Sequence, residues 1–480
     1  MKKLSCIILL LLLMIISCGT NTGTDQKETT ARFYDEAEET VAEISDDLPE
    51  NDYGEYEFRI YSYEILKSKI YVETDVGEVI QDAQYNARIK VEERFNVKIS
   101  FIESGGDDGS HMNMLKNSIL ADSDDFDLTY AHDIGLCNLT LQNIFVNLYN
   151  VPHLDFSKPW WPGKSVGALT VLGQMYVFAN AISTDSIGGI RVLYMNREKA
   201  EDYGIAMPYQ DVFDGSWTMD KLITMTKDLY NDLNGNGEVD EDDFFGYEYR
   251  DQYFICTLEP LEIVPVKKDA DEILKLNLNN ERTLKAVDKM YNLLFGTSAM
   301  FFKGDNKGDN MFVSNRAFAT CLQLSVAGEK LRYSEVNYGI LPMPKLDEMQ
   351  ENYYSGYTSY LCAIPNTARD LDRTGVIVEA MSAEGYKKIL PAYYEIALKN
   401  KYLQDEESVL MLDLINETKM IDFSWCYNMN FTGPYWFMRD MFFVSSTPST
   451  DFASWYGKNE SRINTSLGKI IESFEEMQGN

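Results

Sequence analysis

Apolar positions along the chain follow strand-like and helix-like spacings in turn from residue 57 onward. Residues 57–63 and 97–101 alternate apolar and polar side chains, which predicts two strands. Between them, residues 78–95 place apolar side chains at helical spacing. A further helical stretch at 114–120 leads into a strand-like run at 126–130. Strands separated by helices indicate right-handed crossovers and a mostly parallel α/β sheet.

The same pattern starts again after Gly188. An apolar strand at 191–196 is followed by a short helix that ends at Gly204 and by a helix that begins after Trp217. The chain closes with a long amphipathic helix, because apolar residues recur at helical spacing from 463 to 474. A chain of 480 residues exceeds what one hydrophobic core usually serves, so we expect two α/β lobes.

The first residues predict export. Two lysines precede an apolar run at 7–16, about half the length of a membrane-spanning helix, so residues 1–17 are interpreted as a cleaved signal peptide. The serine directly before Cys18 resembles a lipobox, in which the cysteine thiol receives a lipid anchor. The alternative is an ordinary secretory signal with an incidental cysteine. Residues 18–54 are acidic and poor in apolar groups, which predicts a disordered tether.

The composition is that of a strongly acidic globular protein. The formal net charge is −33 at pH 7, and 45% of the residues are hydrophobic. Such a surface repels phosphate backbones, so nucleic acid is excluded as a partner. The cysteines beyond Cys18 form an odd set without close spacing. We therefore predict no obligatory disulfide and no CxxC metal site.

Four short segments occur in the order typical of one protein family. Residues 126–133 (FDLTYAHD), followed by 144–148, look like a strand, a ligand-facing Asp loop and a helix exit. Residues 192–208 are similar to an "LYYNK…GI…P" stretch, residues 216–220 to a "tWdE" turn, and residues 338–344 to a "yGv.plP" crossover. Together these segments resemble the extracellular solute-binding proteins of ABC importers, in particular the carbohydrate-type family that includes maltose-binding protein.

The resemblance implies a two-lobed, periplasmic-binding-protein-like fold of type II. Crossover segments would lie near 181–188 and 339–344, and the ligand cleft would lie between the lobes. The N-terminal and C-terminal lobes would comprise 55–182 with 345–382 and 183–344 with 383–480, respectively.

Asp133 and Asp185 are the carboxylates that we expect to accept hydrogen bonds from a ligand. Asp133 follows a predicted strand, and open parallel sheets bind ligands beyond the carboxyl ends of their strands. The resemblance implies the same role for an Asp at this position. Asp185 lies on the first predicted crossover. The alternative for Asp133 is a helix N-cap, a position that Asp also favours.

Aromatic side chains are expected to stack on the apolar face of a sugar ring. Trp160 and Trp161 are adjacent, so one of the two is expected to face the cleft and the other the core. Trp425 and Trp436 lie in a region rich in Gly, Asn and aromatic residues, where the family contributes rings to the cleft. Tyr357 is a further candidate. Packing in the core is the alternative for each of them.

Residues 232–243 match the calcium loop of an EF-hand. Oxygen-bearing residues fall at positions 1, 3, 5, 9 and 12 of the loop, and a glycine at position 6 permits the sharp turn. The expected ligands are Asp232, Asn234, Asn236, the backbone carbonyl of Glu238, Asp240 and Asp243. Since a strand-like run follows in place of an exit helix, we expect a half EF-hand with one structural Ca²⁺. The alternative is an acidic surface loop without metal.

The leading hypothesis is a lipid-anchored extracellular receptor. It would be a monomer that closes on a small molecule and delivers it to the permease subunits of an ABC importer. The aromatic content of 13% favours an oligosaccharide as the ligand. No enzyme is predicted, because the chain contains no HExxH, GxSxG or P-loop motif. A secreted glycosidase with paired carboxylates and a calcium-dependent cell-surface binding module remain as alternatives.

Overall fold

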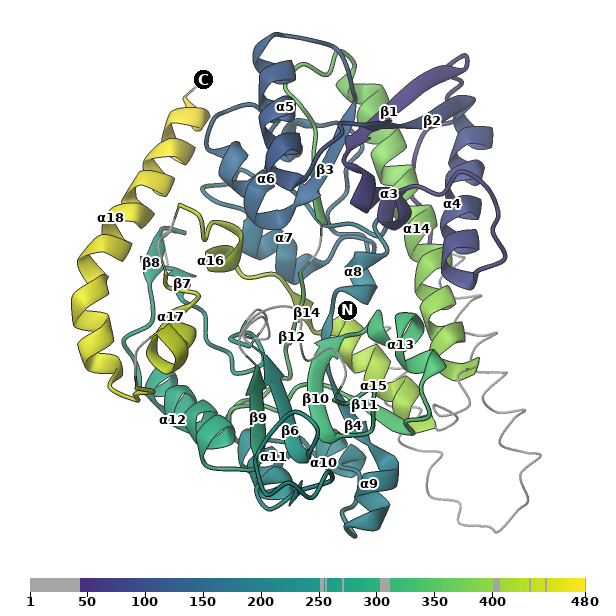
Figure 1. Cartoon of the computed structure of the whole chain (residues 1–480). Coiled ribbons are helices and arrows are strands. Elements are labelled where there is room, and N and C mark those ends of the chain that lie inside the picture. Colours follow the sequence, from purple (N-terminus) through teal and green to yellow (C-terminus); the bar gives the residue numbers. More distant parts are fainter. Residues whose placement is uncertain are drawn as a thin grey trace. The chain divides into compact units, whose positions relative to one another are not determined.

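The computed structural model describes most of the chain beyond residue 43 (Figure 1). The described residues are 44–250, 254, 257–269, 272–302, 311–358, 360–399, 406–430, 433–444 and 447–479. Residues 46–480 form one compact unit. The predicted signal peptide 1–17, the lipidation site Cys18 and most of the predicted tether lie outside the described residues.

The first lobe is built on a four-stranded sheet with the strand order β13-β3-β1-β2. Its strands are β1 (Tyr56–Ser62), β2 (Val97–Glu103), β3 (Leu128–His132) and β13 (Tyr360–Ala363). β1 pairs in parallel with β2 and β3, as predicted from the helices between them. β13 is antiparallel to β3, because by this strand the chain returns from the second lobe. Phe58, Ile60 and Leu128 are fully buried and form the centre of the core.

The second lobe is built on a mixed sheet with the order β11-β4-β10-β6-β5, and β9 pairs with β6. Its strands are β4 (Arg191–Asn196), β5 (Tyr230–Asn231), β6 (Phe244–Arg250), β9 (Ala299–Phe302), β10 (Ala317–Gln323) and β11 (Tyr338–Leu341). β6, β9 and β10 are parallel, whereas β4 is antiparallel to β10 and β11. The prediction of mostly parallel strands is therefore wrong for β4. This strand follows the first crossover and runs opposite to β10 and β11. A separate hairpin joins β7 (Val266–Lys268) and β8 (Leu274–Leu276).

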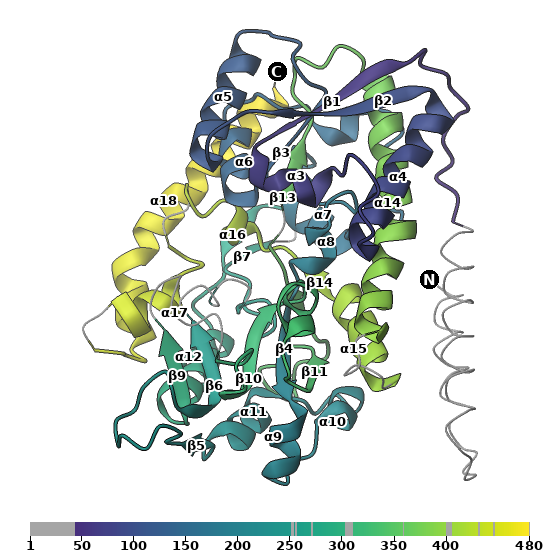
Figure 2. The ribbon, with the colours of Figure 1, turned by 45° about the vertical axis from the view of Figure 1, so that its right-hand side comes forward.

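Helices cover both sheets (Figures 1 and 2). Those of the first lobe are α3 (Glu64–Ile70), α4 (Val79–Phe95), α5 (Asp108–Leu120), α6 (Asp133–Thr140), η1 (Leu148–Asn150) and α7 (Gly163–Leu169). Those of the second are α9 (Arg197–Asp202), α10 (Tyr209–Phe213), α11 (Met219–Thr226), α12 (Glu281–Phe295), α13 (Val326–Glu329), η3 (Leu331–Tyr333), α15 (Glu406–Glu417), α17 (Phe437–Arg439) and η4 (Asp440–Val444). α14 (Leu371–Lys399) packs along α4 and also contacts α15. α4 ends at Asn96, whose φ of 49° is the left-handed conformation of a helix C-cap.

Three described segments connect the lobes. The first contains α8 (Asp185–Gly188), the second contains β12 (Ser355–Gly356), and the third contains β14 (Lys419–Met420). β12 pairs in parallel with β14, and Ile190 forms a bridge with Tyr357. The segments therefore lie side by side between the two sheets, where Figure 1 labels α8, β12 and β14. We call these three segments the hinge. The second lies at 355–356 and not at the predicted 339–344, because that stretch contributes β11 to the sheet of the second lobe. The third was not predicted from the sequence.

The lobe boundaries differ from the predicted ones at three places. The backbone of Lys345 pairs with Trp217 and Met219, so the segment from 345 still belongs to the second lobe. α16 (Phe423–Cys426) contacts α6 of the first lobe. α18 (Phe452–Gln478), yellow in Figure 1, contacts β8 and also accepts a hydrogen bond from Gln174 of the first lobe. These contacts pair residues far apart in sequence, which local patterns do not reveal.

The folded unit begins earlier than predicted. Asp46 is buried and its carboxylate lies 2.6 Å from the guanidinium of Arg94 on α4. The Tyr53 N–H donates to the carbonyl of Phe95. Because basic side chains of the fold neutralise this acidic segment, residues 46–54 lie against the first lobe. The predicted tether therefore extends no further than residue 45.

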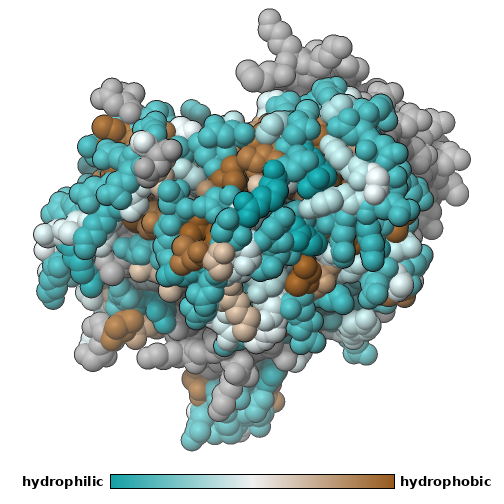
Figure 3. Space-filling view, turned by 90° about the horizontal axis from the view of Figure 1, so that it is seen from above, coloured by the Kyte–Doolittle hydropathy of each residue, from teal (hydrophilic) through white to brown (hydrophobic). Residues whose placement is uncertain are grey.

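The described surface is mostly polar on the face that Figure 3 shows, with small separate hydrophobic patches. Among the helices that the structure describes, none has both the length and the apolar character to cross a membrane.

Candidate functional site

The strand ends of the first lobe gather polar and aromatic side chains at the edge that faces the hinge. Tyr63 follows β1, Asp133 follows β3, and Tyr360 begins β13 directly opposite His132. Burial raises the pKa of Tyr360 to about 12, and the charges of Asp185, Lys69 and Asp133 also act on this phenol. The predicted carboxylates Asp133 and Asp185 are therefore both near Tyr360. Asp133 lies at the carboxyl end of β3, as predicted, and ligand binding by either carboxylate stays a prediction.

Asp133 is fully buried, and protein groups occupy both of its carboxylate oxygens. The indole N–H of Trp425 donates to Oδ2 at 2.7 Å. Oδ1 accepts from the backbone N–H of Ile134 at 2.8 Å and lies 2.7 Å from Nδ1 of His132. Asp133 is the first residue of α6 and does not cap it in the predicted sense, because His132 holds the N-cap position. The carboxylate instead fixes the two rings beside it.

His132 sits between this buried carboxylate and open space. Its side chain is 43% exposed, and its ring lies 6.2 Å from Tyr360 and 6.5 Å from Trp425 between centroids. Partial burial opposes the charged imidazolium, but the charge and hydrogen bond of Asp133, helped by Asp108, raise the pKa of His132 to about 9. The ring is therefore an imidazolium at neutral pH.

An aromatic cluster continues from Trp425 toward the second lobe. The Trp425 ring lies 5.3 Å from Tyr435 and 5.7 Å from Trp436, and the guanidinium of Arg439 lies 5.1 Å from the Trp436 ring. Trp425 and Tyr435 are buried, whereas Trp436 is half-buried. Of the four predicted tryptophans, Trp436 is therefore the only one that is not buried, and its role in ligand binding stays a prediction.

Two buried carboxyl groups lie behind the cluster. Glu259 accepts from the Tyr435 hydroxyl at 3.0 Å, and Asp422 caps α16 through the backbone N–H groups of Ser424 and Trp425. Burial raises the pKa of both groups, and their mutual repulsion raises that of Glu259 further. Both side chains are almost fully buried, so they support the cluster and do not face open space.

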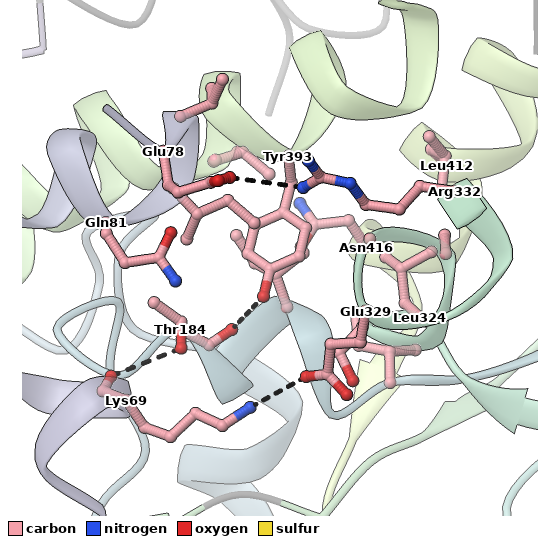
Figure 4. Close-up of a pocket in the computed structure, with 18 of the residues that line it drawn as sticks. Lys69, Glu78, Gln81, Thr184, Leu324, Glu329, Arg332, Tyr393, Leu412 and Asn416 are labelled. Carbon is pink, nitrogen blue, oxygen red and sulfur yellow. Dashed lines mark hydrogen bonds and ion pairs between the residues drawn. The ribbon is translucent and has the colours of Figure 1, made fainter. Parts of the chain in front are cut away.

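A cavity of about 220 Å³ lies between the lobes beside the first crossover (Figure 4). Its polar lining comes from both lobes: Ser68, Lys69, Glu78, Gln81, Thr184, Ser325, Glu329, Arg332, Tyr393 and Asn416. Its apolar lining comes mainly from the hinge and second lobe: Ile187, Ile190, Leu324, Ile340, Leu390, Leu412 and Ile415. The Tyr393 hydroxyl donates to the Thr184 carbonyl at 3.2 Å and so ties α14 to the hinge.

Ion pairs join the two lobes across this cavity, as the dashed lines in Figure 4 show. Lys69 of α3 lies 3.1 Å from Asp185 and 3.3 Å from Glu329 of α13. Arg332 lies 3.3 Å from Glu78 at the start of α4. Burial opposes the charge of Lys69, but Asp185 and Glu329 outweigh it and raise its pKa. Burial raises the pKa of Asp185, and Lys69 opposes that shift.

Three other predicted residues are buried. Trp160 and Trp161 are both 2% exposed, and their indole N–H groups donate to Glu379 at 2.8 and 3.1 Å. Burial raises the pKa of Glu379 to about 7, although the two indoles oppose it. The prediction that one tryptophan of the pair faces the ligand is therefore wrong, because one buried carboxylate uses both. Tyr357 is also buried, with its hydroxyl 3.1 Å from Ser165.

The predicted calcium loop folds with its side-chain oxygens turned toward its own backbone. Asp232 accepts from the N–H groups of Gly235 and Gly237, and Gly237 has the positive φ of 75° that a sharp turn requires. Asp243 is fully buried and accepts from the Tyr230 hydroxyl at 2.9 Å. Asn234 and Asn236 donate to Asp240. The donors are hard oxygens that suit Ca²⁺ in kind. Across the described residues, three or more His, Cys, Asp or Glu side chains do not converge on one point. Calcium binding, which includes the backbone of Glu238, stays a prediction.

Sequence reasoning missed His132, Lys69, Glu329 and Arg332. His132 carried a usable signal, since it precedes Asp133 at a strand end. Lys69 and Glu329 are 260 positions apart, so no local pattern pairs them.

Comparison with known proteins identifies the fold. No protein-family model matches the sequence, and no curated protein matches it. Among solved structures, the galacto-N-biose/lacto-N-biose I-binding protein of an ABC transporter from Bifidobacterium longum has a TM-score of 0.58 at 10% identity, over 89% of this chain and 99% of that one. The acarbose-binding GacH receptor of Streptomyces glaucescens gives 0.52 at 12% identity, over 88% and 98%. An ABC substrate-binding protein from Listeria monocytogenes in complex with cycloalternan gives 0.52 at 10% identity, over 86% and 99%. The chain has the two-lobed α/β fold of these solute-binding proteins, as predicted.

Proposed function

We propose that this protein is a solute-binding receptor that captures a sugar between its lobes and delivers it to an ABC importer. The observation that carries the proposal is the meeting of His132, Trp425 and Trp436 at the strand ends beside the hinge. Similarity to sugar-binding receptors over most of the chain supports the same function. The mechanism needs no bond-breaking step.

Lobe closure would follow from contacts that a ligand makes with both lobes. The part of the hinge that the structure describes contains three crossover segments. A ligand shifts the equilibrium toward the closed form only by its difference in affinity for the two forms. Groups on both lobes at the cavity, such as Gln81 and Asn416, are available for such contacts. We expect the closed form to be the one that docks on the importer permease.

A neutral sugar suits this site better than an anion or an amino acid. Trp436 offers a half-buried ring to the apolar face of a pyranose. His132 supplies a polar donor next to Trp425, which packs against Trp436. The carboxylates of Asp185 and Glu329 lie near Lys69. An oligosaccharide is the size class that we propose, because polar and aromatic groups extend from Lys69 to Trp436.

A thermal-shift screen tests the proposal. The chain would be heated with maltotriose, lacto-N-biose, acarbose or α-D-tagatose, and with arginine and phosphate as non-sugar controls. A ligand at about 100 times its dissociation constant adds about 2.7 kcal/mol to the free energy of unfolding. We expect at least one sugar to raise the melting temperature, and none of the controls. Stabilisation by arginine or phosphate alone would replace the sugar proposal with another ligand class.

The remaining parts of the proposal are the lipid anchor and the metal. We propose that Cys18 is lipidated and holds the receptor on the outer face of the bacterial membrane, which mass spectrometry of the mature N-terminus tests. We also propose that residues 232–243 hold one structural Ca²⁺. The ion would tie the loop between β5 and β6, at the end of the sheet of the second lobe where β5 is the last strand, without any part in sugar binding.

The glycosidase alternative has less support. Glu259 and Asp422 are neighbouring carboxyl groups with raised pKa values, which is a feature of acid–base pairs. Both are 3% exposed or less, so a glycosidic bond does not reach them in this structure. Release of reducing sugar by the purified chain from any glycan that binds would revive the enzyme function.

A further inference from the structure

We propose that His132 is the direct polar contact to the sugar, and that Asp133 acts by positioning His132 and Trp425. This inference rests on the proposed function and reverses the expectation that the buried aspartate itself binds ligand. It follows from which atoms of the two side chains are already used.

Both oxygens of Asp133 already bond protein groups, and neither is exposed. Oδ2 accepts from the Trp425 indole, and Oδ1 is shared by the Ile134 N–H and His132. The side chain has no exposed surface. A sugar hydroxyl that reached this carboxylate would have to displace the indole of Trp425, and so would break the aromatic cluster that forms the wall of the site.

His132 has the opposite properties. Nδ1 faces Asp133, while Nε2 has no hydrogen-bond partner within the described part of the chain, and the side chain is 43% exposed. The ring is held from two sides, by Tyr360 of β13 and by Trp425 of α16. A ring that has two aromatic neighbours and is bonded to Asp133 through Nδ1 directs Nε2–H away from that carboxylate. Trp425, which packs against His132, also packs against the half-buried Trp436.

The charged groups around the ring favour a neutral acceptor. The elements packed against His132 contribute Asp133 from α6, Asp108 from α5, Tyr360 from β13, and the uncharged Trp425 from α16. The charge of the imidazolium is thus already balanced by Asp133. The ligand group that fits is a sugar hydroxyl or ring oxygen, which accepts a charge-assisted hydrogen bond without adding a charge.

Protonation changes what Nε2 can do. Below the raised pKa of about 9, both ring nitrogens donate. Above it, the remaining proton stays on Nδ1 because Asp133 accepts from it, and Nε2 becomes an acceptor. Charge-assisted hydrogen bonds are roughly twice as strong as neutral ones, so we expect sugar affinity to fall about fivefold between pH of about 7.5 and about 10.

The experiment measures the dissociation constant of the tightest binder among maltotriose, lacto-N-biose and acarbose by calorimetry across pH. His132→Gln should weaken binding about fivefold near neutral pH and remove the loss at high pH. Asp133→Asn should move the midpoint of the loss from about 9 to about 6.5, so that affinity recovers as the pH falls below about 6. Recovery at low pH separates positioning from simple structural damage. His153→Gln is the matched control, since His153 pairs with Asp372 on the surface.

Ring-nitrogen NMR of the ligand-free chain measures the pKa of the His132 ring independently of sugar binding. The resonances can be assigned because the sequence contains three histidines. The resonance lost in His132→Gln should titrate near pH 9, and should titrate near the ordinary value in Asp133→Asn. The inference is overturned if a sugar binds and His132→Gln binds it as well as the parent chain, or if the His132 ring titrates near pH 6.5 in the parent. In that case the receptor function still stands. If none of the sugars binds the parent chain at any pH, the proposed sugar function fails, and the inference fails with it.

Discussion

The ion pairs that join the lobes should hold part of the population closed even without ligand. Glu329→Gln combined with Arg332→Gln removes both pairs that cross the cavity. The side chains of Lys69 and Glu329 are 29% and 54% exposed, and those of Arg332 and Glu78 are 38% and 53% exposed. Pairs this exposed contribute about 0.5 kcal/mol each, because water screens the attraction.

The two pairs together therefore stabilise the closed form by about 1 kcal/mol, which corresponds to a roughly fivefold change in the ratio of closed to open molecules. Distances between spin labels at Leu120→Cys in the first lobe and Val239→Cys in the second would report this ratio. Both positions are exposed, at 63% and 68%. At low salt, a larger fraction of the double variant than of the parent should have the longer distance between the two labels. At about 1 M salt, where the Debye length is about 3 Å, the variant and the parent should converge.

Asp202→Asn is the matched control. It removes the Lys199–Asp202 pair, whose exposures of 24% and 54% are close to those of Lys69 and Glu329 but which lies within the second lobe. This change should leave the distance distribution unaltered. The reasoning is refuted if the double variant and Asp202→Asn give the same distribution, or if the effect of the double variant grows with salt.

Three further predictions concern other parts of the molecule. Glu379 has a pKa raised from 4.5 to about 7, so its folded form loses stability as the pH rises from 4.5 through 7. In denaturant unfolding, Glu379→Gln should therefore lower the free energy of unfolding by roughly 3 kcal/mol less at pH of about 8 than at pH of about 4.5. An equal loss at the two pH values would contradict the raised pKa. Trp436→Ala should weaken sugar binding about tenfold without a large change in melting temperature, whereas Trp217→Ala, in the core, should mainly lower the melting temperature. Chelation with EGTA should lower the melting temperature of the parent chain but not that of Asp232→Ala; no change in the parent would leave residues 232–243 as a metal-free loop.

Local patterns in the sequence were sufficient for the elements that lie near the site. The strand at 191–196 is β4 with the predicted bounds, and the helix predicted at 78–95 is α4 with its stop at Asn96. Alternation and helical spacing reflect which face of one element is buried, and that face depends on neighbouring residues. For the same reason, Asp133 could be placed at the carboxyl end of a strand before its contacts were known.

Hydrogen bonds between side chains that are far apart in the sequence could not be predicted in the same way. Trp160 and Trp161 had the composition of a sugar platform, but Glu379, 218 and 219 positions away, bonds both indoles and draws them into the core. Asp133 was placed correctly, yet its oxygens bond Trp425, 292 positions away, and are not free for a ligand. Such pairings depend on how the lobes and the hinge bring distant segments together. Local spacing contains no information about them.

Hydrogen–deuterium exchange of the whole chain, with and without the sugar that stabilises it most, tests the central claim most directly. A ligand held between two lobes should slow exchange in peptides from both sides at once, namely residues 128–140 of the first lobe and 324–333 of the second. Peptides from the outer end of the second lobe, such as 197–214, should exchange at unchanged rates. Protection confined to one lobe, or spread evenly over the chain, would contradict capture of the sugar between the lobes.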